Sequence, residues 1–334
     1  MSTFPVIDST LSPVHLAAWL IEKYNLHFHT SCRLFRTNMN HTYIVSEQEK
    51  KYILRIYSYN RRSETEITEE LRLLNLLKAS GIHVSYPIAD KNNNLLQKID
   101  APEGMRHVVL FSFGEGHKIR NLTQELSYSI GSLLANMHTV TLHQPINRIQ
   151  YNIDSLVAKA YQQAKLYISE SLEEMKFIQA SAEVLHAVFE ASAAPDIRRG
   201  IVHLDVWYDN MSITDAGKIT LFDFDNCGNG WLVLDIGYFC MQLFYTQPDK
   251  KEYECKLQSF LDGYRTITSI PEEEIQLIPY AGLAIWIYYL GVQAERFDNF
   301  SNIFFTENYV KMYIGKVKEW VNYHHINIHT AAIC

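Results

Sequence analysis

The residues best suited to chemistry gather in one stretch, IVHLDVWYDNMSITDAGKITLFDFDNCG, which runs from Ile201 to Gly228. It places one histidine, five aspartates and two asparagines among Ile, Val, Leu and Phe residues of the kind that form buried strands. A buried carboxylate is costly unless it is paired, protonated or bound to a metal. These acids therefore either lie on exposed turns or hold an ion.

The spacing of these residues suggests a metal site and a base. Asn210 precedes a short predicted strand, MSIT, and Asp223 ends a second, KITLFDF. Asp225 would share the face of Asp223 in an extended strand, unless a turn at Asn226 breaks it. A hairpin turn at DAG would bring Asn210 near Asp223, and an amide oxygen with a carboxylate suits Mg²⁺. Asp205 would be free to accept a proton, whereas Asp215 is expected to be only a turn residue. An H-x-D pattern alone is usually structural, so the prediction rests on the combination.

Two kinds of element must position these residues. In the first part of the chain, HTYIVSE and KKYILRIY predict a hairpin, and RHVVLFSFGEG predicts a strand that runs into a loop. Between them, a capping box of Ser63 and Glu66, leucines at helical spacing and a stop at Gly81 predict a helix. Beyond about residue 120 the pattern is mainly helical, to about Tyr323. The predicted fold class is α+β and bilobal, with a small β-rich lobe over residues 1–112, a larger mainly helical lobe over 113–334, and ligands in the cleft between them.

Composition limits the function. The formal net charge is −7 and no long basic run offsets it, which argues against nucleic acid or an anionic membrane as the main partner. Five scattered cysteines without a C-x-x-C pair fit a reducing compartment, and the first residues lack the features of a signal peptide. The longest apolar stretch, YAGLAIWIYYLGV, is shorter than the roughly 20 residues that span a bilayer and predicts a buried helix. We expect a soluble cytoplasmic protein; the sequence predicts no oligomeric state.

HLDVWYDN followed by LFDFDNCG resembles the catalytic segment of the aminoglycoside phosphotransferase and choline kinase-like family, which has the protein-kinase fold. The segments IGSLLANMHTV, VLDIGY, FLDGYR and EELRLLNLLKASGIHVSYPI resemble other parts of that family. The resemblance implies that Asp205 is the catalytic base, that Asn210 and Asp223 bind Mg²⁺, and that ATP is the phosphoryl donor.

The sequence departs from the family at three places. Leu204 stands between His203 and Asp205, where the family usually has glycine. Arg55 replaces the strand lysine that touches ATP phosphates; it keeps the charge but differs in reach and geometry. The expected nucleotide-covering loop, RTNMNHTY, has no glycine, so backbone donors from Asn38 to His41 would have to face phosphate.

The remaining site residues follow from the resemblance. Glu70 is the predicted partner of Arg55, with Glu66 and Glu69 as alternatives. The residues Leu110, Phe111 and Phe113 are expected along the lobe connection, where their backbone groups would hold adenine. Asp235 and His203 are expected to order the catalytic loop. The aromatic residues Trp286, Tyr288 and Tyr289 would line a pocket for a cationic ligand or, more simply, belong to the core, and Glu295, Arg296 and Asp298 would reach a polar substrate or form surface ion pairs.

The predicted function is an ATP- and Mg²⁺-dependent kinase acting on a small-molecule hydroxyl, such as that of an aminoglycoside, amino alcohol, homoserine or sugar. One alternative is a protein Ser/Thr kinase of the same fold. Another is a catalytically inactive nucleotide-binding scaffold, motivated by Arg55 and the glycine-free loop; retention of Asp205, Asn210 and Asp223 argues against it. A metal-dependent hydrolase is a third, but its metal cluster would usually need more histidines.

Overall fold

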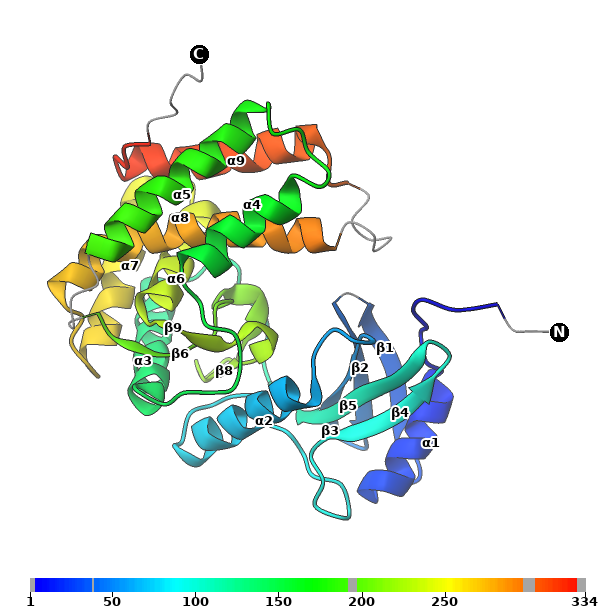
Figure 1. The fold of residues 1–334 in the computed structure, drawn as a ribbon. Helices are drawn as coiled ribbons and strands as arrows, with labels where there is room; N and C mark the ends of the chain where they lie inside the picture. The colour runs from blue at the N-terminus through cyan, green and yellow to red at the C-terminus, as the bar shows by residue number, and fades with distance from the viewer. Residues whose placement is uncertain (1–3, 38, 192–196, 297–303, 329–334) are drawn as a thin grey trace. The chain divides into compact units, whose positions relative to one another are not determined.

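The computed structural model describes residues 4–37, 39–191, 197–296 and 304–328. The chain forms two compact units: Met1–His117 with Met211–Asp225, and Lys118–Asn210 with Asn226–Cys334. The first is β-rich and the second mainly helical, which confirms the predicted fold class (Figure 1). The predicted lobes, 1–112 and 113–334, remain a prediction. The compact units differ from them chiefly because residues 211–225 belong to the first unit.

The first unit is built on a five-stranded sheet. Its strands are β1 (Ser31–Thr37), β2 (Asn40–Glu47), β3 (Lys50–Tyr57), β4 (Gln97–Ala101) and β5 (Gly104–Ser112). Their order is β1-β2-β3-β5-β4, and every neighbouring pair is antiparallel. The predicted hairpin of β2 and β3 and the predicted strand β5 are confirmed, whereas β1 and β4 are not among the predicted elements.

Helix α1 (Pro13–Tyr24), also not predicted, lies along one side of the sheet (Figure 1). Its buried residues form one core cluster with sheet residues: Leu16, Leu20, Tyr24, Tyr43, Val45, Leu54, Ile56, Val108 and Leu110. Successive strand residues point to opposite faces. Because Leu54 and Ile56 face this core, Arg55 projects from the other face of β3.

Helix α2 (Glu64–Ala79) begins with the predicted capping box. Ser63 Oγ accepts from Glu66 N at 3.2 Å, and Glu66 Oε2 accepts from Ser63 N at 2.9 Å, so two backbone donors at the helix start are satisfied. After the helix, Gly81 has φ +80°, a conformation that L side chains rarely adopt. The helix thus fixed carries Glu70, whose side chain is buried.

The second unit packs its helices in pairs. They are α3 (Gln124–Thr141), α4 (Lys159–Ala164), α5 (Glu173–Ala191), α6 (Val233–Thr246), α7 (Lys250–Arg265), α8 (Glu272–Glu295) and α9 (Glu307–Tyr323), and a π-helical turn, Asp154–Ala158, leads into α4. Helix α3 packs on α7, and α6 and α4 pack on α8. A Cβ added at Gly131 would lie 2.0 Å from the Phe260 carbonyl oxygen, so only glycine permits the approach of α3 to α7.

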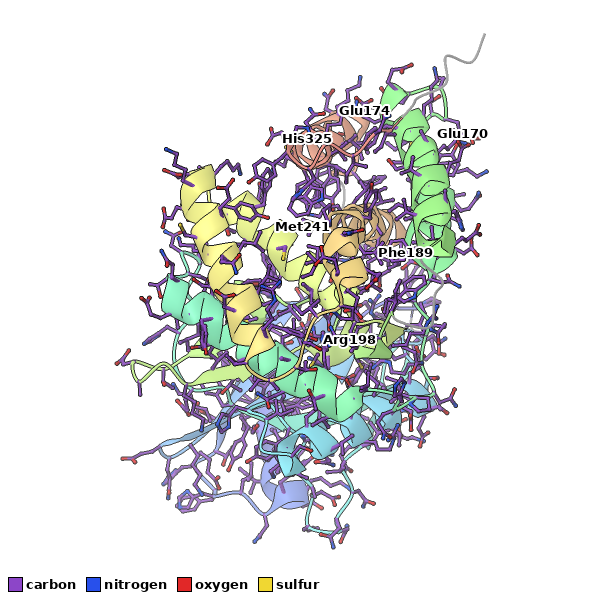
Figure 2. All side chains as sticks on the ribbon, turned by 90° about the vertical axis from the view of Figure 1, so that its left-hand side faces the viewer. Glu170, Glu174, Phe189, Arg198, Met241 and His325 are labelled. Atoms are coloured by element: carbon purple, nitrogen blue, oxygen red, sulfur yellow. The ribbon has the colours of Figure 1, made fainter. Side chains whose placement is uncertain are left out.

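Helix α8 contains the apolar stretch YAGLAIWIYYLGV. The helix has 24 residues, and among the described residues it alone is long and apolar enough to cross a membrane. Most of its apolar window, 67%, is buried inside the protein. Figure 2 shows the side chains that fill the space between the helices of this unit, among them the fully buried Met241 of α6. The prediction of a buried helix is therefore confirmed, although the helix is longer than the stretch that predicted it.

Two short antiparallel pairs carry the chemistry-bearing stretch. Strand β6 (Arg199–Val202) pairs with β9 (Gly228–Trp231) in the second unit, and β7 (Met211–Ile213) pairs with β8 (Ile219–Leu221) in the first. The predicted hairpin is confirmed, with Met211 opposite Leu221. Within the first unit, Leu221 O accepts from Ser85 N at 3.0 Å, which ties this hairpin to the segment after α2.

Candidate active site

Arg55 is the centre of a charged network in the first unit. Its Nη1 donates to Glu70 Oε1 at 2.9 Å and its Nη2 donates to Asp223 Oδ1 at 3.0 Å. The side chains of Arg55 and Glu70 are 11% and 1% exposed, whereas that of Asp223 is 43% exposed. The predicted contact between Arg55 and Glu70 is confirmed. The alternatives are occupied elsewhere, because Glu66 caps α2 and Glu69 pairs with Arg72.

The network is held by more than one bond. Tyr57 Oη donates to Glu70 Oε2 at 3.2 Å, so both oxygens of Glu70 are engaged. Burial, followed by the negative charge of Glu70, raises the pKa of Tyr57 well above its usual range, so the hydroxyl stays a donor. Burial alone would lower the pKa of Arg55, but the carboxylates of Asp223 and Glu70 outweigh it and raise that pKa. Arg55 is therefore a fixed cation beside Asp223.

The two acids of the D-F-D segment have different surroundings. Asp223 adopts a left-handed backbone conformation, φ +67°. Asp225, which is 5% exposed, pairs with Arg62 through Nε at 3.3 Å and lies 3.7 Å from Arg61 Nη2. Arg62 Nη2 also donates to the Asp225 carbonyl at 2.7 Å. Of the two alternatives, the turn is the one observed, since a 3₁₀ turn, Phe224–Asn226, follows Asp223. Asp225 anchors the loop before α2.

In the second unit the carboxylate of Asp205 accepts hydrogen bonds from Asn210 and Tyr238. Asn210 Nδ2 donates to Asp205 Oδ2 at 2.7 Å and to its carbonyl at 3.0 Å, and Tyr238 Oη donates to Oδ1 at 2.5 Å. Asn210 is 6% exposed. Because its amide nitrogen serves Asp205, its oxygen is directed elsewhere, and none of the residues that the structure describes donates to that oxygen. An amide oxygen in this state suits a hard cation.

A buried carboxylate orders the loop that carries Asp205. Asp235 of α6, fully buried, accepts from His203 N at 2.8 Å, from Leu204 N at 2.6 Å, and lies 3.1 Å from His138 Nε2. His203 is also fully buried, and its Nδ1 accepts from Asp205 N at 3.1 Å. The expected scaffold roles of Asp235 and His203 are confirmed by these contacts.

The aromatic residues of α8 divide between core and loop. Trp286 is buried, 7% exposed, as expected for the core. Tyr289 instead donates to Leu204 O at 2.9 Å. Tyr238, which also contacts the loop, is absent from the predicted site, although VLDIGY contains it. The available signal was its position one helical turn after Asp235, which places both on one face of α6.

The expected nucleotide-covering loop is mostly strand. Thr37 ends β1 and Asn40 begins β2, so the connection is two residues long; Asn38 lies outside the described residues. His41 is opposite Thr37 on one side and Ile56 on the other, and its ring Nε2 lies 3.1 Å from Asp8 Oδ2. His41 is thus part of the sheet and does not belong to a free loop.

The residues expected to hold adenine begin inside β5. Leu110 is buried in the core and its carbonyl accepts from Ile88 N at 2.7 Å, while Phe111 is opposite Ile53 of β3. Phe113 follows the last residue of the strand. Contact of these residues with a nucleotide remains a prediction, and Phe113 is the one of the three that lies beyond the strand pairing.

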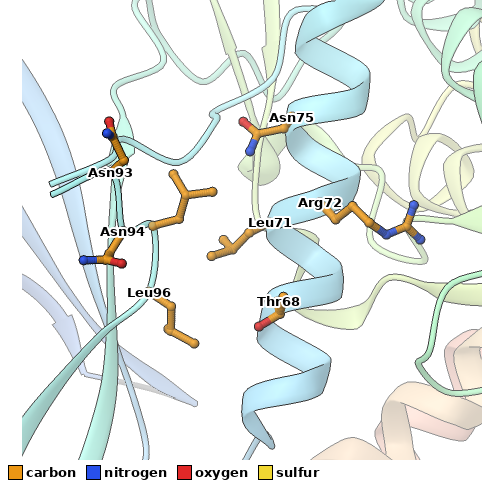
Figure 3. A pocket seen from close by; sticks show the side chains of 8 residues that line it. Thr68, Leu71, Arg72, Asn75, Asn93, Asn94 and Leu96 are labelled. Atoms are coloured by element: carbon orange, nitrogen blue, oxygen red, sulfur yellow. The ribbon is translucent and has the colours of Figure 1, made fainter.

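Other features lie apart from these residues. A pocket of about 380 Å³ in the first unit lies between α2 and the loop before β4 (Figure 3), and no carboxylate lines it. Within the described ranges, no group of three or more His, Cys, Asp or Glu side chains is placed to hold a metal. Glu295 pairs with Lys159 at 2.9 Å, which fits the surface ion pair, and Asp298 lies outside the described residues.

Comparisons with known proteins agree with this fold. The model of a family described as the phosphotransferase enzyme family matches residues 32–268. Amicoumacin kinase from Bacillus subtilis (strain 168) is 24% identical over 248 residues, which cover 72% of this chain and 73% of that protein. A solved microcompartment-associated aminopropanol kinase has a TM-score of 0.76 at 20% identity and covers 95% of this chain and 100% of its own. An amicoumacin kinase in complex with AMP-PNP, Ca²⁺ and Ami has a TM-score of 0.75 at 20% identity, covering 93% of each chain.

Proposed function

We propose, because the chain belongs to the phosphotransferase enzyme family, that it is an ATP- and Mg²⁺-dependent kinase that phosphorylates a hydroxyl group of a small molecule. Family membership agrees with the resemblance drawn from HLDVWYDN and LFDFDNCG. The acceptor is proposed to be an amino alcohol, an aminoglycoside, homoserine or a sugar. Among these, similarity to an aminopropanol kinase favours an amino alcohol.

One observation carries the proposal: the head of Arg55 is buried between Glu70 and Asp223. A strand residue of an inactive scaffold would need only a solvated head. Keeping a guanidinium out of water beside two carboxylates requires a specific geometry, since each ion loses hydration. A fork-shaped cation fixed in this way is suited to binding phosphate oxygens.

The residues present fit the proposed metal. The amide oxygen of Asn210 is directed away from Asp205. The carboxylate of Asp223 is partly exposed and accepts a hydrogen bond from Arg55 at Oδ1. Both supply oxygen, the atom type that Mg²⁺ prefers. When bound, Mg²⁺ would neutralise charge on the β- and γ-phosphates. Asn210 and Asp223 are therefore the proposed ligands.

In the proposed reaction the acceptor oxygen forms a bond to the γ-phosphorus of ATP, and the bond from that phosphorus to the bridging oxygen of ADP breaks. Asp205 takes the proton of the acceptor hydroxyl. Arg55 holds phosphate oxygens, and the backbone of Leu110, Phe111 and Phe113 is proposed to meet adenine. Most of the rate acceleration would come from positioning and electrostatic stabilisation.

The test is a panel of hydroxyl acceptors and a protein acceptor, each incubated with the chain and Mg²⁺-ATP, with ADP release as the readout. We expect ADP release with a small molecule, and loss of that release in Asp205→Asn. Mg²⁺-ATP at about 100 times its dissociation constant should stabilise both forms by roughly 2.7 kcal/mol. No stabilisation and no ADP release would refute the proposal, and release with the protein acceptor alone would favour a protein kinase.

A further inference from the structure

Two helices hold the backbone of Leu204 in an unusual conformation. Its φ is +62°, which typically costs a residue other than glycine about 1–2 kcal/mol. Asp235 of α6 accepts from its N–H at 2.6 Å, and Tyr289 of α8 donates to its carbonyl at 2.9 Å. Both backbone polar groups of Leu204 are thus fixed, so the residue before Asp205 keeps one orientation without glycine.

The same face of α6 reaches the carboxylate of Asp205. Tyr238 follows Asp235 by three residues, and its hydroxyl donates to Asp205 Oδ1 at 2.5 Å. Tyr238 is 2% exposed, and its ring centroid lies 5.5 Å from that of Tyr289. Packing therefore places the Tyr238 hydroxyl independently of Asp205, which makes it a rigid donor.

The Tyr238 hydroxyl keeps its proton. Burial, and then the charge of Asp205, raises the pKa of Tyr238 well above its usual range. Asp205 also acts on Tyr289, and the two tyrosines act on each other; further contributions come from Tyr288 of α8 and Tyr313 of α9. An ionised carboxylate accepts hydrogen bonds and does not donate them. The neutral phenol of Tyr238 is therefore the donor in this pair.

Tyr238 and Asn210 bond different oxygens of the Asp205 carboxylate. The Tyr238 hydroxyl donates to Oδ1 and the Asn210 amide donates to Oδ2. Rotation of the carboxylate about its Cβ–Cγ bond would break both bonds. The two bonds together therefore fix the direction of the carboxylate.

We propose that Tyr238 is a positioning residue that fixes the carboxylate of Asp205 to receive the proton of the acceptor hydroxyl. The proposal rests on the proposed kinase function, because only there does Asp205 act as a base. Tyr238 bonds Oδ1, the carboxylate oxygen that Asn210 does not bond. The hydroxyl of Tyr238, and not its ring, carries this role.

The test uses Tyr238→Phe, which keeps the buried ring and removes the hydroxyl. Loss of a hydrogen bond to a charged group corresponds to a fall in kcat of about tenfold to a hundredfold. We expect KM for ATP to stay within about twofold, since Tyr238 contacts the base, and the acidic limb of the pH–rate profile to move to higher pH. Tyr253→Phe is the matched control, because Tyr253 is fully buried in α7 and its hydroxyl has no partner among the described residues. It should leave kcat and the pH profile unchanged.

A second measurement does not depend on the acceptor. Carboxyl-¹³C NMR of aspartate-labelled protein, assigned with Asp205→Asn, follows the titration of Asp205 in the wild type and in both tyrosine variants. We expect a higher midpoint in Tyr238→Phe and none of this change in Tyr253→Phe. If the wild type transfers phosphate but the two tyrosine variants behave alike in rate and titration, the positioning role is overturned and the kinase function stands. If the wild type transfers no phosphate, the proposed kinase function fails. Independently of that result, an unchanged midpoint of the Asp205 titration in Tyr238→Phe would overturn the coupling between Tyr238 and Asp205.

Discussion

Arg55 donates to Asp223 at 3.0 Å, although 168 residues separate the two along the chain. The same guanidinium pairs with Glu70, so one side chain joins a strand, a helix and the D-F-D segment. Because Asp223 is also a proposed metal ligand, Arg55 fixes the direction of a carboxylate that must meet Mg²⁺.

Replacement of Arg55 should impair nucleotide use. Arg55→Ala removes a charge-assisted contact to phosphate, and we expect Mg²⁺-ATP affinity to fall by about tenfold to a hundredfold. Arg55→Lys should restore part of it, because the charge returns without the fork. Calorimetric titration of the three forms at one salt concentration measures this, and equal affinities would remove Arg55 from the nucleotide site.

The stability of the same pair can be tested separately. Arg55→Ala leaves the buried carboxylate of Glu70 without its cation, which typically costs about 3–5 kcal/mol. Arg55→Ala/Glu70→Gln should be more stable than Arg55→Ala, since it removes that uncompensated charge. Urea unfolding of the single and double variants decides, and additive losses would show that the two side chains do not interact.

Substitution of Asp223 should affect Mg²⁺-dependent nucleotide binding, whereas substitution of Asp225 should affect stability. Asp223→Asn should abolish the Mg²⁺ dependence of nucleotide binding with little loss of stability, because the side chain is 43% exposed. Asp225→Asn should keep that dependence but lower the free energy of unfolding by about 1.5–3 kcal/mol, because it weakens buried bonds to Arg62. Titration of each variant with ATP, in the presence and absence of Mg²⁺, measures this dependence. Its loss in Asp225→Asn would contradict the assignment.

At Leu204 a glycine variant should be at least as stable as an alanine variant, the reverse of the order expected inside a helix. Leu204→Ala and Leu204→Gly both lose a fully buried side chain, which costs about 2–5 kcal/mol. At φ +62° glycine relieves strain that alanine keeps, so the glycine variant should be at least as stable as the alanine variant. At Leu134, buried within α3, glycine should instead be about 1 kcal/mol less stable than alanine. Thermal unfolding of the four variants checks this, and the same order at both positions would argue against strain at Leu204.

His324 should make stability depend on pH. Burial, with a smaller contribution from His325, lowers the pKa of His324 to about 4, below its ordinary 6.5. Between these values the unfolded chain binds a proton that the folded chain does not, so the free energy of unfolding falls as pH falls from 6.5 to 4. His324→Phe keeps a ring against Trp320 and should flatten that slope, whereas His15→Phe, at an exposed position, should not. Urea unfolding across this range measures it, and parallel slopes in wild type and His324→Phe would refute the effect.

Local signals were readable in the sequence. The capping box of Ser63 and Glu66 uses only neighbouring residues, and it predicted where α2 begins. The pairing of Arg55 with Glu70 came instead from the family resemblance, which left Glu66 and Glu69 as alternatives. The outer strands β1 and β4 were missed, since each lies at an edge of the sheet and is partly exposed along its length, which weakens the apolar pattern. Helix α1 was missed although Ser12 at its N-cap and Pro13 at its first position form a recognised start signal.

Tertiary contacts were not readable in the same way. The hydroxyl of Tyr238 contacts Asp205 only because α6 packs where it does, and a sequence separation of 33 residues follows no period that predicts the pair. The resemblance supplied the role of Asp205 but not its partners. The division of labour between Asp223 and Asp225 likewise depends on a turn, which the alternation of an extended strand does not contain.

The discontinuous first unit has a consequence for synthesis on the ribosome. Residues up to His117 leave the ribosome well before Met211–Asp225, which complete the same unit. At about 5–20 residues per second, the intervening stretch takes on the order of 5–20 s to be made. Throughout that interval the nascent sheet lacks the Leu221 carbonyl for Ser85, and Arg55 faces Glu70 without Asp223. The amino-terminal part of the first unit is therefore incompletely paired until residues 211–225 have been synthesised.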